Sequence, residues 1–139
     1  MDDPTYYPFH LFAATFESET HARQFAFEQW QPEPPADASS AEFAAWEDRN
    51  PTWRLAQELE FFMDSDFVEL DESLEYVQSL VANEAQKALL WSRSQGAFSH
   101  FIIVGDNAIY GDRRSPDTCN SNPRQPQSTA TLTYLGHFN

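Results

Sequence analysis

The chain has 139 residues, of which 41% are apolar and 15% aromatic, enough core material for one folded domain of ordinary size. Its net charge of −14 repels nucleic acid and anionic membranes and attracts basic surfaces, so we expect neither nucleic acid nor membrane as a partner. The charge is uneven. Residues 1–84 hold 19 Asp and Glu against three Arg, a net charge of −16, whereas residues 85–139 hold three Asp against five Lys and Arg, a net charge of +2.

Targeting and redox features of the sequence are few. Cys119 is the single cysteine, which excludes an internal disulfide and fits a reducing compartment. The start of the chain, MDDPTYYPF, has neither the basic nor the apolar segment of a secretory signal. The apolar run at residues 101–104 is too short to span a bilayer. We therefore expect a cytoplasmic protein.

The first predicted strand covers residues 9–15, which are rich in aromatic side chains. A helix capped by Ser18 is predicted after it and must end before Pro32. Its apolar stripe is expected to be Ala22, Phe25, Ala26 and Trp30. The Pro-rich residues 31–40 are predicted to form a stiff, solvated loop.

Two more helices are predicted in the acidic part of the chain. Ser39 followed by Glu42 is a capping-box pattern that opens a helix over residues 41–48. Asn50 followed by Pro51 is a start signal for the next helix. The buried face of that helix is expected to consist of Leu55, Ala56, Leu59, Phe62 and Met63.

A short strand is predicted over residues 67–70, with alternate residues on opposite faces. Asp71 is expected to cap a helix over residues 72–81, and another helix is predicted over residues 84–94.

The strongest strand signal covers residues 97–104, and the turn signal after it predicts a hairpin with residues 108–110. A long polar loop follows at residues 111–128, and strand alternation resumes over residues 129–135. Together these elements predict an α+β fold: a small, mainly antiparallel sheet packed with helices, in a single domain that spans all 139 residues.

Tests for chemistry in the sequence are negative. The stretch DSDFVELDE at residues 64–72 resembles the start of a calcium loop, but Val68 and Glu69 stand where that loop needs an oxygen ligand and a turn glycine. Its acids also lack the contrasting environments of an acid/base pair. The histidines have no zinc-binding spacing: His10, His21, His100 and His137. We therefore predict no catalytic residue, metal or cofactor, and expect that the protein is not an enzyme.

The remaining feature is a set of acidic residues with aromatic residues among them. Protein interfaces draw affinity from a few aromatic anchors, while complementary charge speeds the encounter of the partners. The predicted partner-binding residues are Trp46, Glu47, Asp48, Trp53, Asp64, Asp66, Phe67, Glu69, Asp71 and Glu72. Trp53 lies to the side of its predicted helix face and could instead border the core.

Five segments of the chain carry a family resemblance: FHLFAATFES at residues 9–18, ETHARQFAFEQW at 19–30, NPTWRLAQELEFFMDSDFVEL at 50–70, FSHFIIV at 98–104 and TYLGHF at 133–138. In this order they resemble the Immunity protein 22 family of bacterial polymorphic toxin systems. The resemblance implies an α+β fold, no catalysis, and protection of the producing cell by binding a toxin. The chain departs from the family in the first strand, where family members tend to have Trp and Gly.

The resulting hypothesis is an immunity protein that binds its cognate toxin and blocks the active site. Toxins that act on nucleic acid need basic clefts to attract phosphate, so a nuclease or deaminase is the leading class. Toxins that attack lipid, peptidoglycan or NAD stay open. The alternative is an acidic adaptor or anti-activator that binds a basic host protein, and a third option is a small enzyme without a recognisable motif.

Overall fold

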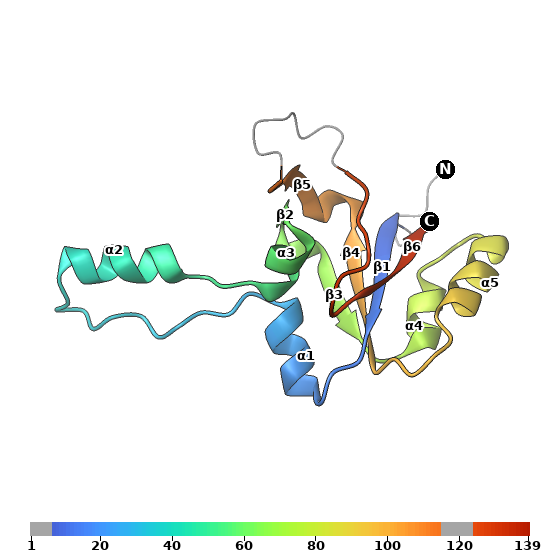
Figure 1. Cartoon of the computed structure of the whole chain (residues 1–139), viewed down its shortest axis with the longest axis horizontal. Coiled ribbons are helices and arrows are strands. Elements are labelled where there is room, and N and C mark those ends of the chain that lie inside the picture. Colours follow the sequence, from blue (N-terminus) through green and yellow to red (C-terminus); the bar gives the residue numbers. More distant parts are fainter. Residues whose placement is uncertain (1–6, 115–123) are drawn as a thin grey trace.

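The computed structural model describes residues 7–114 and 124–139 (Figure 1). At its centre is a four-stranded antiparallel sheet in the order β3-β4-β1-β6. Its strands are β1 (Phe9–Ala14), β3 (Val68–Asp71), β4 (His100–Gly105) and β6 (Thr133–Phe138). A separate antiparallel pair joins β2 (Phe61–Met63) to β5 (Ile109–Asp112). The fold is α+β, as the sequence predicts.

Helices cover both faces of the sheet (Figure 1). On one side lie α1 (Glu19–Ala26) and α3 (Arg54–Leu59), and on the other lie α4 (Leu74–Ser79) and α5 (Glu84–Arg93). Two single-turn 3-10 helices connect strands: η1 (Ser65–Phe67) and η2 (Asp106–Ala108). Because helices pack on both faces, the two central strands β1 and β4 are buried at nearly every position.

The core has two parts, one on each face of the sheet. Phe12 of β1 and Ile102 of β4 belong to the part under α1 and α3. Their neighbours Leu11 and Ile103 belong to the part under α4 and α5. This is the period-two alternation of a strand, and it decides which side chains reach which surface of the molecule.

The predicted helix caps of α1 and α2 (Ser40–Arg49) are confirmed. The Ser18 hydroxyl accepts a hydrogen bond from the backbone N–H of His21, and the Ser39 hydroxyl accepts one from Glu42, both at 3.1 Å. The end of α1 was predicted too late, because the helix stops at Ala26 and leaves Trp30 exposed.

The predicted start signal at Asn50 is wrong. Asn50 instead follows the last turn of α2: its side-chain oxygen accepts from the N–H of Gln31 at 2.7 Å, and its amide donates to the Trp46 carbonyl at 2.8 Å. The next helix, α3, begins only at Arg54. It ends where Glu60 adopts a left-handed conformation with φ 60°, so Phe62 and Met63 lie in β2 rather than on a helix face.

The predicted hairpin after β4 is also wrong. β4 pairs with β1 and β3, while η2 redirects the chain so that β5 pairs with β2. The predicted loop at residues 111–128 therefore begins inside β5, and residues 115–123, including Cys119, lie outside the described residues. The last strand begins at Thr133 rather than at residue 129.

Helix α2 stands apart from the sheet at the end of a long excursion of the chain (Figure 1). None of the residues of α2 is buried. The excursion is closed at its root by two backbone hydrogen bonds between Gln29 and Thr52, at 2.7 and 2.9 Å. We call residues 30–51 the arm.

None of the helices in residues 7–114 and 124–139 combines the length and the apolar character needed to cross a membrane.

Candidate functional site

The acidic stretch of the sequence contributes to a groove at the β3 edge of the sheet, with a volume of about 740 Å³. Its acidic residues are Asp66, Glu69 and Asp106. Its apolar lining includes Tyr7, Phe67, Leu80 and Ile103. We call this site the acidic groove. Its volume falls within the range of typical ligand pockets, and its mixture of apolar lining and acidic side chains is that of a binding surface.

Strand pairing and a turn build the acidic groove. Glu69 of β3 lies directly opposite Ile103 of β4, so both side chains point to the same face of the sheet. Four residues before β3, Asp64 accepts a hydrogen bond from the backbone N–H of Asp66 at 3.0 Å and so caps η1. This turn leaves the Phe67 ring 47% exposed at the groove. A large exposed ring is typical of a contact residue.

Tyr76 of α4 holds Glu69 in place. The Tyr76 hydroxyl donates a hydrogen bond to Glu69 Oε1 at 2.7 Å. This bond, together with desolvation and the nearby acids, raises the pKa of Tyr76 to about 12. The tyrosine therefore keeps its proton at neutral pH and fixes the carboxylate without neutralising it.

In the part of the chain that the structure describes, the carboxylates of the acidic groove are not neutralised by Lys or Arg. Among the described residues, no Lys or Arg forms an ion pair with Asp66, Glu69 or Asp106. Two arginines of the C-terminal part lie instead around β2 and β5, where Arg114 pairs with Glu60 and Arg124 with Asp112. The groove therefore keeps its negative potential.

The other residues of the acidic stretch do not join the groove. Asp71 accepts a hydrogen bond from the N–H of Ser73 at 2.7 Å, and Ser73, not Asp71, is the N-cap of α4. Glu72 lies at the opposite end of β3, where its carboxylate is close to the Glu19 carboxylate and the His100 imidazole. The acids of residues 64–72 are neighbours in the sequence, but the fold places them in separate environments.

The predicted residues near Trp46 are also separate from the acidic groove. Trp46, Glu47 and Asp48 lie on α2 in the arm, where the Trp46 ring packs against Trp30 with ring centroids 5.9 Å apart. The prediction for Trp53 is wrong, because its side chain is a core residue. Trp53 is only 8% exposed, and its indole N–H donates to the Ala26 carbonyl at 2.7 Å.

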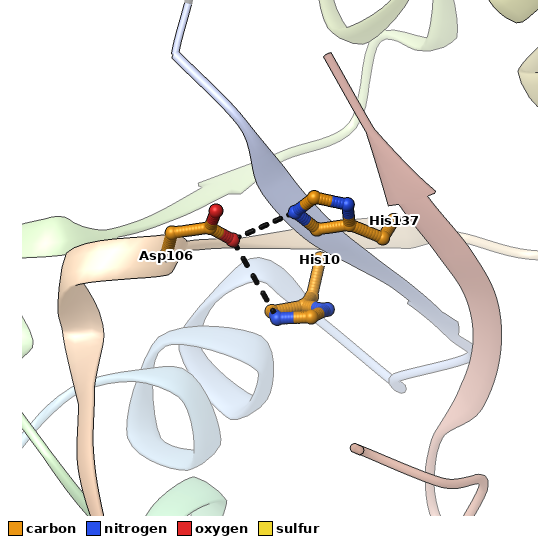
Figure 2. Close-up of side chains that lie close together, drawn as sticks. All are labelled: His10, Asp106 and His137. Carbon is orange, nitrogen blue, oxygen red and sulfur yellow. Dashed lines mark hydrogen bonds and ion pairs between the residues drawn. The ribbon is translucent and has the colours of Figure 1, made fainter. Parts of the chain in front are cut away.

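A cluster of two histidines and a carboxylate adjoins the groove, and no spacing pattern in the sequence predicts it (Figure 2). His137 Nε2 lies 2.8 Å from Asp106 Oδ1, and His10 Nε2 lies 3.7 Å from the same oxygen. Burial lowers the pKa of His10 to about 4, with His137 acting in the same direction and Asp106 against it. His10 is therefore neutral at neutral pH, and its contact with Asp106 is not an ion pair.

A second cluster lies at the other end of the sheet. The ring of His100 is buried, with Nδ1 2.8 Å from Ser99 Oγ and Nε2 2.8 Å from Glu19 Oε2. The hydrogen bond from His100 lowers the pKa of Glu19. Although the order resembles a Ser-His-acid triad, the Ser99 hydroxyl also accepts from the N–H of Phe16 at 2.8 Å and so serves the β1–α1 connection.

No family model matches the chain, and comparisons with curated proteins and with solved structures give no significant match. The resemblance to the Immunity protein 22 family therefore stays a prediction, and the site has to be interpreted from its own geometry.

Proposed function

We propose that the protein binds a basic protein partner through the acidic groove, and that this partner is a bacterial toxin that it neutralises as an immunity protein. The observation that carries the proposal is the groove itself: Asp66 and Glu69 flank the exposed ring of Phe67 above an apolar lining, with no Lys or Arg paired to them among the described residues.

The shape of the groove favours a protein partner that inserts an apolar side chain between basic ones. The apolar lining offers Leu80 and Ile103 to such a side chain, and Phe67 provides an aromatic edge. Burial of an apolar anchor supplies most of the affinity of an interface, because the surrounding contacts mainly exclude water. The acids around it then select a partner that carries Lys or Arg.

The electrostatics favour a partner whose function depends on a basic cleft. A chain with a net charge of −14 is drawn toward such a cleft over long range, and a toxin that acts on nucleic acid needs one to bind phosphate. Occupation of that cleft by Asp66 and Glu69 would exclude the substrate. The resemblance to the Immunity protein 22 family points to the same class of partner.

The test is binding to the toxin encoded beside this protein, measured as association and dissociation rates at several salt concentrations. D66N/E69Q removes two negative charges from the groove, and the matched control E47Q/D48N removes two from the exposed face of α2. We expect D66N/E69Q to slow association about tenfold at low salt and E47Q/D48N to change it less than twofold.

A second readout is survival of cells that express the toxin together with each variant. D66N/E69Q should protect less well than the control variant. Equal effects of the two variants on binding would remove the acidic groove as the site. Binding without protection would contradict the immunity proposal. Failure to bind the toxin encoded beside this protein would contradict it as well and would favour the adaptor alternative.

A further inference from the structure

The geometry points to a binding site for a divalent transition metal ion such as Zn²⁺ at the cluster of His10, Asp106 and His137 (Figure 2). We call these three residues the histidine site. Its ligand atoms would be the Nε2 nitrogens of the two histidines and one carboxylate oxygen. This inference is independent of the proposed function, because it needs no protein partner.

Strand register brings the two imidazoles together. His10 of β1 and His137 of β6 are direct cross-strand partners, and their ring centroids lie 4.8 Å apart. Directly opposed residues on neighbouring strands have Cβ atoms about 5 Å apart, so their side chains reach a common point above the sheet. The backbone that carries these two ligands is part of the central sheet.

Asp106 completes the set from the other side of β1. It is the first residue of η2, directly after β4, and its backbone N–H donates to the Pro8 carbonyl at 3.2 Å. That bond holds the turn next to the start of β1 and directs the carboxylate toward both rings (Figure 2). Its Oδ1 lies 2.8 Å from His137 Nε2 and 3.7 Å from His10 Nε2.

These separations suit one small ion. Metal–ligand bonds of 2.0–2.1 Å in a tetrahedral arrangement place ligand atoms roughly 3.3 Å apart. The distances from Asp106 Oδ1 to the two histidine nitrogens lie on either side of that value, and all three ligand atoms lie within 4.8 Å of one another. A metal would replace the hydrogen atom between His137 and Asp106, and side-chain rotations would bring the three atoms into range.

The donor set selects the type of ion. Two imidazoles with one carboxylate favour Zn²⁺ and related ions over Mg²⁺ or Ca²⁺, which prefer oxygen ligands only. Tyr134 supports the set, because its hydroxyl lies 2.9 Å from Nδ1 of His10 and thereby turns Nε2 toward Asp106. Ligating histidines commonly have such a partner on their second nitrogen.

The site leaves room for water or an exchangeable ligand. The side chain of His10 is 17% exposed, whereas those of Asp106 and His137 are 44% and 43% exposed. A fourth coordination position would therefore face solvent, as in sites where the metal exchanges or acts on a bound molecule. The cluster of Glu19, Glu72 and His100 has only one nitrogen donor, already bonded to Glu19, and serves as an internal comparison.

The experiment uses the full chain, freed of metal by chelation, titrated with Zn²⁺ by calorimetry and with Co²⁺ by visible absorption. We expect one ion per chain, with the visible bands of four- or five-coordinate Co²⁺ and without the thiolate charge-transfer band that binding by Cys119 would add. Ring-proton signals of His10 and His137 should shift when Zn²⁺ is added.

Variants separate the histidine site from adventitious binding. H137A and D106N should each weaken Zn²⁺ binding by about 100-fold, whereas Y134F, which alters only the support of His10, should weaken it by about tenfold. E72Q makes the same charge change as D106N at the comparison cluster and should leave affinity unchanged. Absence of binding with one-to-one stoichiometry would overturn the inference. Affinity that survives H137A and D106N, or falls in E72Q, would overturn it as well.

Discussion

The β2–β5 end of the molecule and the acidic groove differ in whether their carboxylates form ion pairs with arginine. At the β2–β5 end, Glu60 pairs with Arg114, and Asp112 pairs with Arg124 at 3.2 Å. In the groove, Asp66 and Glu69 have no Lys or Arg partner among the described residues. The two regions also belong to different sheets: β2 and β5 form the two-stranded pair, whereas the acidic groove lies on the central four-stranded sheet.

The charged side chains at the β2–β5 end stabilise the fold, whereas those of the acidic groove face outward. Arg124 also donates to the carbonyls of Leu59 and Glu60, and its guanidinium lies 4.1 Å from the centre of the Phe61 ring. Its ion pair is thus part of the packing that joins α3 to β2. The groove carboxylates add self-repulsion and little packing, which is the arrangement expected where the compensating charge belongs to another molecule.

The largest expected effect comes from breaking the β2–β5 end. R124M keeps the length of the side chain but leaves Asp112, which is 11% exposed, and two carbonyl groups without their donor. We expect the free energy of unfolding, measured by urea denaturation, to fall by about 3 kcal/mol. D66N/E69Q should change it by less than about 0.5 kcal/mol. A comparable loss in both variants would erase the distinction between the two regions.

The next effect concerns affinity rather than stability. F67A removes the exposed ring of the acidic groove and should weaken partner binding by about 2 kcal/mol, or roughly 30-fold, measured by calorimetry. Its unfolding curve should match that of the unchanged chain, because Phe67 is 47% exposed. Y110F serves as a control for an exposed aromatic outside the groove and should bind normally.

A cation placed in the acidic groove would make it resemble the β2–β5 end. Asn107 is exposed and lines the groove beside Asp106, so N107R should provide an internal partner for the acids. We expect association with a basic partner to become about tenfold slower, while N107Q leaves the rate unchanged. An unchanged rate in N107R would mean that the charge of the groove does not guide the encounter.

The smallest effect is spectroscopic. Tyr76 should titrate with a pKa of about 12 when followed by absorbance near 295 nm, with Y76F identifying its contribution. E69Q should bring that pKa back toward 10, the ordinary value for tyrosine. Because the folded state holds the Tyr76 proton more tightly than the unfolded state, this stabilising contribution is complete below pH 10 and is lost as the pH rises toward 12. A Tyr76 pKa that E69Q leaves unchanged would contradict the hydrogen bond.

Local features of the fold could be predicted from the sequence because their interactions are local. The caps at Ser18 and Ser39 each bond to an N–H three residues later, and the apolar runs of β1 and β4 mark buried strands. Pairing is different, since any two strands can exchange the same backbone hydrogen bonds. The turn after β4 suggested a hairpin, but β4 has both edges occupied by β1 and β3.

The candidate site likewise has a part that local sequence predicts and a part that depends on the sheet order. Asp66, Phe67 and Glu69 stand out in the sequence because they lie within four consecutive residues, and strand alternation predicts that Phe67 and Glu69 share a face. The opposite wall of the groove, including Asp106, comes from a distant segment whose position depends on the sheet order. The same is true of His10 and His137, which lie near opposite ends of the chain and meet only through the β1–β6 register.

Asp106 belongs to both the acidic groove and the histidine site. A carboxylate shared by two sites couples them thermodynamically, because any ligand that engages it at one site changes its availability at the other. An ion bound at the histidine site would lower the affinity of the acidic groove for a cationic protein. Binding of that protein would lower the affinity of the histidine site for the ion by the same factor. Binding at either site would then be detected as a change of affinity at the other site, because Asp106 is common to both.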